Sequence, residues 1–107
     1  MADIDGTEGD DILDGTEAND EINGFGGDDT LNGLGGADTL RGGSGTNIVN
    51  GGDGVDFIES TGNDTISGGA DNDQIDFDTD GVVSAFGDGG DDLFRLFDAV
   101  TGVLDGG

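Results

Sequence analysis

The chain has 107 residues, of which 26 are acidic and 2 are basic, so its net charge is -24, and it contains no cysteine or histidine. These absences exclude a disulfide framework, nitrogen and sulfur metal sites, and catalytic triads built on imidazole. A chain this acidic repels polyanions, which excludes nucleic acid as an expected partner, and no apolar run approaches the roughly 20 residues of a membrane-spanning helix.

Low hydrophobicity combined with high net charge is typical of disorder, because too little apolar surface can be buried to offset chain entropy. Two arginines cannot compensate 26 carboxylates. The composition therefore predicts either a disordered acidic polymer or a fold that takes up cations.

A nine-residue repeat begins at once and organises most of the chain. Glycine fills the first slot of six consecutive blocks, aspartate or asparagine the sixth slot, and an aliphatic residue the eighth. The first slots are Gly6, Gly15, Gly24, Gly33, Gly42 and Gly51, the sixth are Asp11, Asp20, Asp29, Asp38, Asn47 and Asp56, and the eighth are Leu13, Ile22, Leu31, Leu40, Val49 and Ile58. A block one residue shorter brings Asp64 and Ile66 into these slots, the next brings Asp73 and Ile75, and Ile4 fits a partial block at the start.

The spacing of the aliphatic residues predicts short strands. One aliphatic residue in nine is too sparse for an amphipathic helix, but it fits the inward-pointing centre of a very short strand. The other slots are rich in Gly, Asp and Asn, which is typical of turns. Two strands and two turns make a coil of about 18 residues, and stacked coils make an all-β parallel solenoid.

The sixth-slot aspartates predict a cation site. Turns two blocks apart stack on one edge about 4.8 Å from each other, which brings Asp11 near Asp29. Carboxylates this close repel unless a cation lies between them. A hard divalent ion with oxygen ligands at about 2.3 to 2.6 Å fits, and calcium suits an irregular oxygen cage better than magnesium does.

Several blocks resemble a known family. GFGGDDTLN (24–32), GLGGADTLR (33–41), GGSGTNIVN (42–50) and GGDGVDFIE (51–59) are similar to the G-G-x-G-x-D-x-U-x nonapeptide of RTX, or haemolysin-type, calcium-binding repeats. The resemblance covers residues 4–76, with a further copy at 87–95. It implies a single module over residues 1–107, folded as a right-handed parallel β-roll with calcium between the turns.

The resemblance also implies the ligands, which are sixth-slot side chains and turn carbonyls. The turns at Asp29, Asp38 and Asp56 match most fully, because glycine fills both their first and fourth slots. The implied side-chain ligands are Asp11, Asp20, Asp29, Asp38, Asn47, Asp56, Asp64, Asp73 and Asp92, and the implied carbonyl donors are Gly24, Gly26, Gly33, Gly35, Gly42 and Gly51. If neighbours on one edge share ions, the blocks offer about six calcium sites.

Departures from the pattern predict weaker sites. Ala18 and Asp71 stand in the fourth slot, where a positive φ would strain a side chain, so the sites at Asp20 and Asp73 are expected to suffer. Asn47 offers only a neutral oxygen, which predicts a weaker site on its edge.

The last third of the chain is less regular. Residues 77–86 break the register, which predicts either a bulging loop or a longer coil. Residues 87–107 contain the further repeat and the most apolar stretch, Leu93 to Leu104, which predicts either a cap over the end of the roll or the start of a further domain. The final Asp105-Gly106-Gly107 begins like another repeat, which favours a truncated chain.

The function expected from this pattern is a calcium-binding module without enzymatic activity that folds on binding Ca²⁺ and belongs to a larger secreted bacterial protein. The first five residues lack the features of a secretory signal peptide, and the resemblance implies type I secretion to an extracellular location. Little free calcium in the cytosol would keep the chain unfolded, and calcium outside would fold it. The passenger activity of such a protein stays open.

Three other interpretations were weighed. Thr30, Thr39 and Thr65 share the seventh slot and suggest an ice- or surface-binding adhesin, although Ile48 and Phe57 interrupt their row. A disordered acidic polymer that buffers calcium is the second. Adjacent acids at Asp10-Asp11, Asp28-Asp29 and Asp91-Asp92 suggest a glycosidase, but one environment repeated many times does not separate an acid from a base. Arg41 and Arg95 are expected to face outward beside acidic turns.

Overall fold

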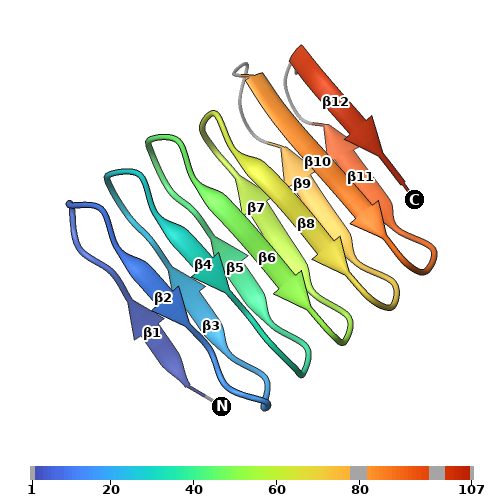
Figure 1. Cartoon of the computed structure of the whole chain (residues 1–107), viewed down its shortest axis with the longest axis horizontal. Coiled ribbons are helices and arrows are strands. Elements are labelled where there is room, and N and C mark those ends of the chain that lie inside the picture. The colour runs from blue at the N-terminus through green and yellow to red at the C-terminus, as the bar shows by residue number, and fades with distance from the viewer. Residues whose placement is uncertain (1, 78–81, 97–100, 107) are drawn as a thin grey trace.

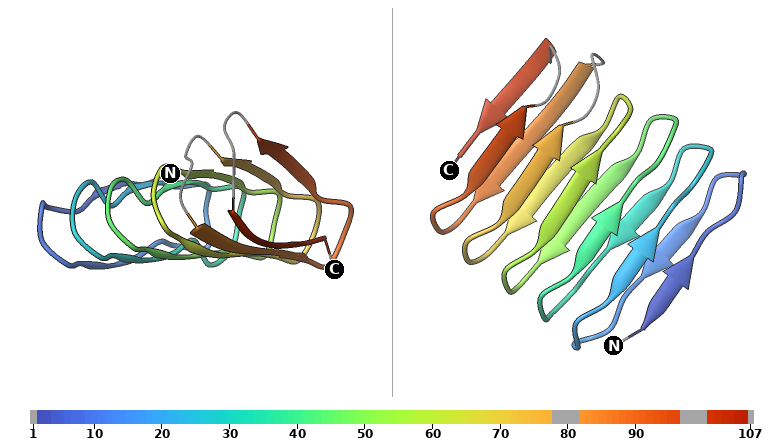
Figure 2. Two further views of the ribbon diagram at one scale, coloured as in Figure 1. Left: turned by 90° about the horizontal axis from the view of Figure 1, so that it is seen from above. Right: turned by 180° about the vertical axis from the view of Figure 1, so that it is seen from behind.

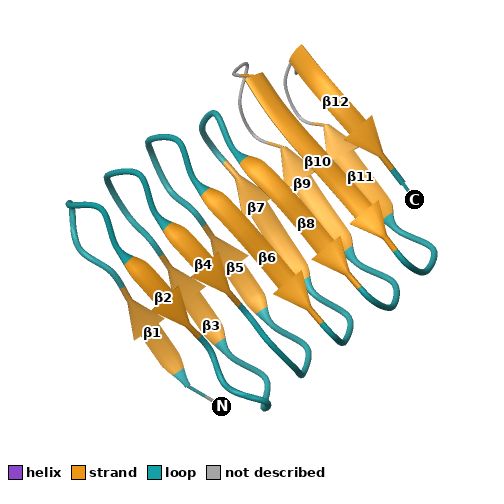
Figure 3. Cartoon of the chain, in the orientation of Figure 1, coloured by secondary structure: helices purple, strands orange, loops and turns teal. Residues whose placement is uncertain are grey.

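The computed structural model describes residues 2–77, 82–96 and 101–106, and all regular elements in this part of the chain are β-strands (Figure 3). The strands are β1 (Asp3–Asp5), β2 (Ile12–Asp14), β3 (Glu21–Asn23), β4 (Thr30–Asn32), β5 (Thr39–Arg41), β6 (Ile48–Gly52), β7 (Phe57–Ser60), β8 (Thr65–Gly69), β9 (Gln74–Phe77), β10 (Val82–Asp88), β11 (Leu93–Leu96) and β12 (Thr101–Asp105). Among the described residues there is no helix that could span a membrane.

The strands form two parallel six-stranded sheets. One sheet has the order β1-β3-β5-β7-β9-β11 and the other the order β12-β10-β8-β6-β4-β2. Successive strands therefore alternate between the sheets, and the chain advances from blue to red along a row of coils (Figure 1). Seen from above, the coils are flattened, with one sheet on each broad side (Figure 2). This is the predicted all-β parallel solenoid.

The strand register confirms a coil of about 18 residues. Leu13 pairs with Leu31, and Leu31 pairs with Val49, eighteen residues apart in each case. Val49 pairs with Ile66, seventeen residues on, because the block at Ser60 is one residue shorter. Ile66 pairs with Ala85, nineteen residues on. The strands keep the aliphatic residues paired in spite of these differences in coil length, since a one-residue slip within a strand would turn its side chains to the opposite face.

The core is a single row of aliphatic side chains between the sheets. The eighth-slot residues from Ile22 to Ile75 are all buried to 1% exposure or less, and Ile4 and Leu13 pack against them at the first coils. The predicted inward positions are therefore confirmed. The sequence did not predict that Phe77 and Ala85 are also fully buried. The ring of Phe77 lies 6.2 Å from that of Phe94, which extends the core into the last coils.

The described parts of the irregular region belong to strands of the two sheets. Phe77 ends β9, and residues 82–86 belong to β10, which pairs with β8 on one side and β12 on the other. Residues 78–81 of this region lie outside the described residues, as do residues 97–100 of the apolar stretch. The described parts of that stretch are β11 and the greater part of β12, the last strands of the two sheets.

Candidate metal sites at the turns

The turns lie in two rows, one along each edge of the solenoid (Figure 1). We call edge 1 the row that leads from odd-numbered to even-numbered strands, and edge 2 the row that leads from even-numbered to odd-numbered strands. The sixth-slot residues of edge 1 are Asp11, Asp29, Asn47 and Asp64, and those of edge 2 are Asp20, Asp38, Asp56, Asp73 and Asp92. The turns at 78–81 and 97–100, also on edge 1, lie outside the described residues.

One oxygen of each stacked sixth-slot side chain holds the coils together. The backbone N–H of Asp38 donates to Oδ1 of Asp56 at 2.8 Å, and the N–H of Asp56 donates to Oδ1 of Asp73 at 2.8 Å. The same bond recurs from Asp11 to Asp64 on edge 1 and from Asp20 to Asp92 on edge 2. Stacked carboxylates were expected to repel unless a cation lies between them. In the structure, one oxygen of each carboxylate accepts a backbone N–H, and only the other oxygen is left for a cation.

The other oxygen divides the turns into two kinds. Within the described residues, Oδ2 is buried without a hydrogen-bond partner at Asp29, Asp38, Asp56, Asp73 and Asp92. We call these the open turns. Asp38 and Asp56 are only 2% and 1% exposed. Leaving a buried carboxylate oxygen without a donor is costly, so these atoms indicate a missing positive partner.

Each unpartnered oxygen of the first four open turns faces a backbone carbonyl from the next coil. A Cβ atom placed on Gly33 would lie 2.6 Å from Oδ2 of Asp38 and 2.5 Å from the carbonyl oxygen of Gly51. A Cβ on Gly24 would lie 2.5 Å from Oδ2 of Asp29 and 2.6 Å from the carbonyl oxygen of Gly42. Both oxygens therefore lie against the first-slot glycine, where any side chain would collide with them. The absence of a side chain at this slot lets a carboxylate oxygen and a carbonyl oxygen of the next coil come close together, and calcium takes oxygen ligands of both kinds.

The same arrangement recurs at the next two turns of edge 2. Oδ2 of Asp56 converges with the carbonyl oxygen of Gly68 beside Gly51, and Oδ2 of Asp73 converges with the carbonyl oxygen of Gly87 beside Gly68. Gly68 and Gly87 were not among the predicted carbonyl donors, although their first-slot position was readable in the sequence. The structure places Gly26 and Gly35 elsewhere in the turn, against the carboxylates of Glu8 and Glu17.

Three turns are closed by a hydroxyl group, and we call them the capped turns. Oδ2 of Asp11 accepts from the backbone N–H of Thr7 at 2.6 Å and from its hydroxyl at 3.0 Å. Thr16 makes the same two bonds, at 2.6 and 3.0 Å, to Oδ2 of Asp20. The Ser60 hydroxyl donates to Oδ2 of Asp64 at 2.7 Å. These capping groups were not predicted, although a hydroxyl residue in the first or second slot of each block was visible in the sequence.

Asn47 makes a fourth arrangement on edge 1. Its amide Nδ2 donates to the carbonyl oxygen of Gly43 at 3.2 Å, while its Oδ1 accepts from the N–H of Asp29. The amide N–H thus stands where an open turn presents a carboxylate oxygen. This geometry agrees with the expectation that the turn attracts a cation less strongly.

The backbone of the turns follows the same division. The open turns and the Asn47 turn have a positive φ in both the second and fourth slots, for example 73° at Leu34 and 91° at Gly36. Among the described residues, the capped turns have none. The expected strain at Ala18 was therefore wrong, because its turn is built on Thr16, whose hydroxyl accepts from the Ala18 N–H at 3.1 Å. Asp71 does take a positive φ, 76°, as expected, yet Asp73 beside it belongs to an open turn.

Burial shifts the acidity of these carboxyl groups. It raises the pKa of Asp56 to about 7 and that of Asp73 to about 6, and it raises the pKa of Asp38 and Asp29 above the usual range. At Asp20 the donor N–H of Thr16 has the largest effect, and the pKa is lowered. Burial also raises the pKa of Asp64, although Ser60 caps its turn. Burial therefore favours the neutral carboxyl in turns of both kinds, and the Thr16 donors favour the ionised form of Asp20.

No group of three acidic side chains converges among the described residues. Each candidate site instead combines one carboxylate oxygen with a backbone carbonyl oxygen. Oxygen ligands of these two kinds are typical of calcium sites, which are built largely from loop backbone. The donor set therefore fits calcium.

The adjacent acids have a structural role in the stack. The carboxylates of Asp10 and Asp28 are exposed, and each accepts a backbone N–H from the following coil. Asp10 accepts from the N–H of Asp28 at 2.8 Å, and Asp28 accepts from the N–H of Thr46 at 2.9 Å. Each pair thus places one acid toward the surface and one in the sixth slot. The repetition of this arrangement gives no support to a glycosidase.

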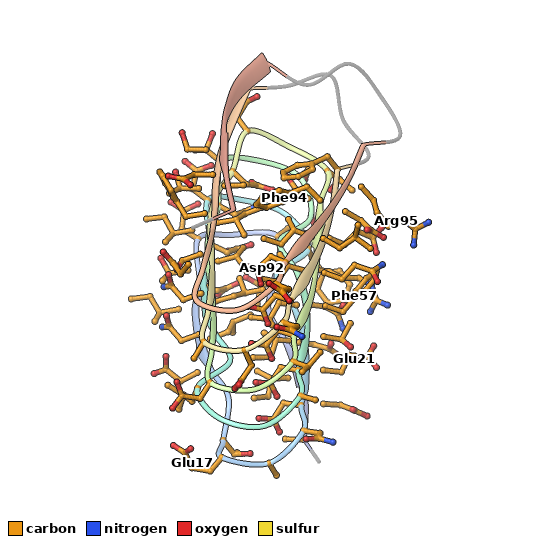
Figure 4. All side chains as sticks on the ribbon, turned by 90° about the vertical axis from the view of Figure 1, so that its right-hand side faces the viewer. Glu17, Glu21, Phe57, Asp92, Phe94 and Arg95 are labelled. Carbon is orange, nitrogen blue, oxygen red and sulfur yellow. The ribbon has the colours of Figure 1, made fainter. Side chains whose placement is uncertain are left out.

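The outer strand faces do not carry one row of threonines. Thr39 lies on β5 in one sheet, whereas Thr30 and Thr65 lie on β4 and β8 in the other, separated by Ile48 of β6. Glu21, Phe57 and Arg95 project from the outer face of the β1 sheet (Figure 4).

The arginines were expected beside acidic turns, but they pair with strand residues. Arg41 lies 3.2 Å from Glu21 and 3.3 Å from Glu59, and Arg95 lies 3.8 Å from Asp76. These pairs are on the outer face of the sheet, away from the candidate metal sites.

Comparison with known families gives one match. The model of the RTX calcium-binding nonapeptide repeat, which spans four copies, matches residues 5–40, 24–58 and 60–81. These ranges contain four of the five open turns and all three capped turns. No curated protein and no solved structure matches the chain.

Proposed function

We propose that this chain, which belongs to the RTX calcium-binding nonapeptide repeat family, is a module that folds when Ca²⁺ binds between its coils. The observation that carries the proposal is the set of five buried, unpartnered Oδ2 atoms, four of which face a carbonyl oxygen of the next coil. A cation held between these two oxygens would satisfy both and join two coils.

The residues of the chain have separate parts in this process. First-slot glycines lack the side chain that would keep the carboxylate oxygen and the carbonyl oxygen of the next coil apart. Oδ1 of each sixth-slot side chain fixes the carboxylate on the backbone of the preceding coil, which aims Oδ2 at the site. Bound calcium supplies the positive charge that a chain of net charge -24 lacks. Because binding requires stacked coils, the binding free energy becomes folding free energy.

The setting we propose is a larger secreted bacterial protein. Family membership supports it, since RTX repeats typically occur in secreted proteins. Low calcium would keep the acidic chain extended and able to pass a type I export channel, and extracellular calcium would fold it by mass action. We assign no enzymatic activity to the module, because its acids repeat one environment and do not separate an acid from a base.

The test is far-UV circular dichroism of the chain in EDTA, in millimolar calcium and in millimolar magnesium. We expect a strong β signal with calcium and little with magnesium, which demands a tighter octahedral shell. Absence of a calcium-induced signal would overturn the proposal and leave the disordered acidic polymer. A thermal-hysteresis measurement on the calcium-loaded chain tests the ice-binding interpretation, for which the divided threonines give no support.

A further inference from the structure

Among the described turns, the two edges have unequal numbers of unpartnered carboxylate oxygens. Edge 2 has four consecutive open turns, at Asp38, Asp56, Asp73 and Asp92. Among the described turns of edge 1, only that of Asp29 is open, because Thr7 and Ser60 cap two of the others and Asn47 is neutral. A regular repeat predicts equal edges, so this inequality comes from particular side chains.

We propose that calcium binds mainly along edge 2, and that the described turns of edge 1 apart from Asp29 are closed by the protein's own donors. This inference rests on the proposed function and specifies where its ions lie. Three gaps of edge 2 combine an unpartnered carboxylate oxygen with a facing carbonyl oxygen, beside Gly33, Gly51 and Gly68, whereas the carboxylate oxygen beside Gly15 already accepts from Thr16. The described part of edge 1 has one such gap with an unpartnered oxygen, beside Gly24. The repeat spacing alone predicts the same number of calcium sites on each edge.

The donors of edge 1 compete directly with a metal ion. The Ser60 hydroxyl already bonds Oδ2 of Asp64, whose residue is 2% exposed. The Thr7 N–H and hydroxyl both bond Oδ2 of Asp11. A calcium ion at these turns would have to displace existing hydrogen bonds, whereas at Asp56 it meets an oxygen that has no donor to lose. The difference in competing donors favours edge 2.

Asp56 and Asp64 make a matched pair for the test. Both are in the middle of the chain, both are 1–2% exposed, and each accepts through Oδ1 a backbone N–H from the preceding coil, at 2.8 and 3.0 Å. Asparagine keeps that Oδ1 acceptor in either place. At position 56, asparagine would replace the unpartnered carboxylate oxygen by an amide N–H that faces a carbonyl oxygen. Asn47 already directs such an amide N–H toward a carbonyl oxygen. At position 64, the amide N–H would face a hydroxyl, which can turn to accept.

The experiment counts bound ions by native mass spectrometry at saturating calcium for the unaltered chain, Asp56→Asn and Asp64→Asn. We expect Asp56→Asn to lose at least one ion and Asp64→Asn to keep the full number. A loss at Asp64→Asn equal to that at Asp56→Asn would overturn the inference. Failure of the unaltered chain to bind calcium would instead overturn the proposed function, so the two failures are distinguishable.

A gain-of-site variant keeps the inference testable if Asp56→Asn does not fold. Asn47→Asp puts a carboxylate into a turn that already has positive φ at Gly43 and Gly45, 82° and 94°. The substitution replaces the amide Nδ2 of Asn47, which now donates to the Gly43 carbonyl oxygen, by a carboxylate oxygen. We expect one additional ion and a stronger dependence of folding on calcium. An unchanged ion count would contradict the claim that the donor at this position closes the turn.

Discussion

Edge 1 and edge 2 are built from the same nonapeptide but treat its carboxylate differently. Along edge 2, the sixth-slot aspartates from Asp38 to Asp92 keep one buried oxygen without a donor. Along the described part of edge 1, Thr7, Ser60 and the amide of Asn47 supply donors within the turn. One side chain in the first, second or sixth slot thus decides whether a turn closes on itself or requires a cation.

The two edges are joined by the strands between them. Each strand leads from a turn of one edge to a turn of the other and contributes to the single core row. An ion bound on edge 2 would therefore order a whole coil, including the turn of edge 1 that belongs to it. Through this coupling, metal on one edge would stabilise both, as expected for a solenoid whose coils contact only their neighbours.

The largest effect we expect comes from pH in the absence of calcium. Burial raises the pKa of Asp56 to about 7 and that of Asp73 to about 6, from an ordinary value of 3.8. Between pH 7 and about 4 the folded state therefore binds more protons than the unfolded state, so folding becomes more favourable as the pH falls. In EDTA, circular dichroism should show the β signal growing from pH 7 to about 4.

Two variants compare an open turn with a capped turn of the same edge. Asp56→Asn mimics the protonated carboxyl, so it should raise the folded fraction in EDTA at pH 7 and flatten the pH dependence. Asp20→Asn is the control, since the pKa of Asp20 is lowered and its contribution to stability is lost, not gained, as pH falls. A β signal that shrinks on acidification would show that buried carboxylates do not limit the folding of the calcium-free chain.

The next effect tests the coupling through the core. Leu40 is fully buried on β5, between the Asp38 turn of edge 2 and the Asn47 turn of edge 1. Leu40→Ala should lower the free energy of unfolding in saturating calcium by about 2 to 5 kcal/mol. Because the oxygens of both edges are untouched, the ion count should not change. Urea unfolding and native mass spectrometry measure the two quantities.

Ile12→Ala is the matched control on the outer face, since Ile12 is 76% exposed. It should change the free energy of unfolding by less than about 0.5 kcal/mol. Loss of ions from Leu40→Ala at saturating calcium would contradict the separation of core and metal sites.

The fold was predictable because its signals are strictly periodic. The aliphatic residues from Ile4 to Ile75 and the glycine slots gave the coil length, the strand centres and the parallel stacking. The less regular end was harder, since Phe77 and Ala85 enter the core from a segment that breaks the period. For that segment the sequence predicted either a bulging loop or a longer coil. The register in which β10 pairs with β8 places Ala85 beside Ile66 in the core.

The candidate sites were predictable only to the level of the repeat. Spacing identified the sixth-slot residues, but it treated Asp56 and Asp64 alike. Whether an oxygen is free depends on hydrogen bonds within each turn, such as that of Ser60, and on the turn conformation that a hydroxyl residue selects. The repeat period identifies the residues that all copies of the motif have in common, whereas the difference between the edges depends on residues that vary from copy to copy.

The smallest effect tests a single cap on edge 1. Ser60 is 1% exposed, and its hydroxyl donates to Oδ2 of Asp64 at 2.7 Å. Ser60→Ala leaves that buried oxygen without a donor and should lower the free energy of unfolding by about 1 to 3 kcal/mol. Urea unfolding at the lowest calcium concentration that folds both chains measures the change, because a calcium ion bound at the opened turn would offset it at higher concentrations. Ser44→Ala, at an exposed position of another turn on the same edge, is the control. If Ser60→Ala is as stable as Ser44→Ala, the hydroxyl does not close its turn, and the contrast between the two edges loses its physical cause.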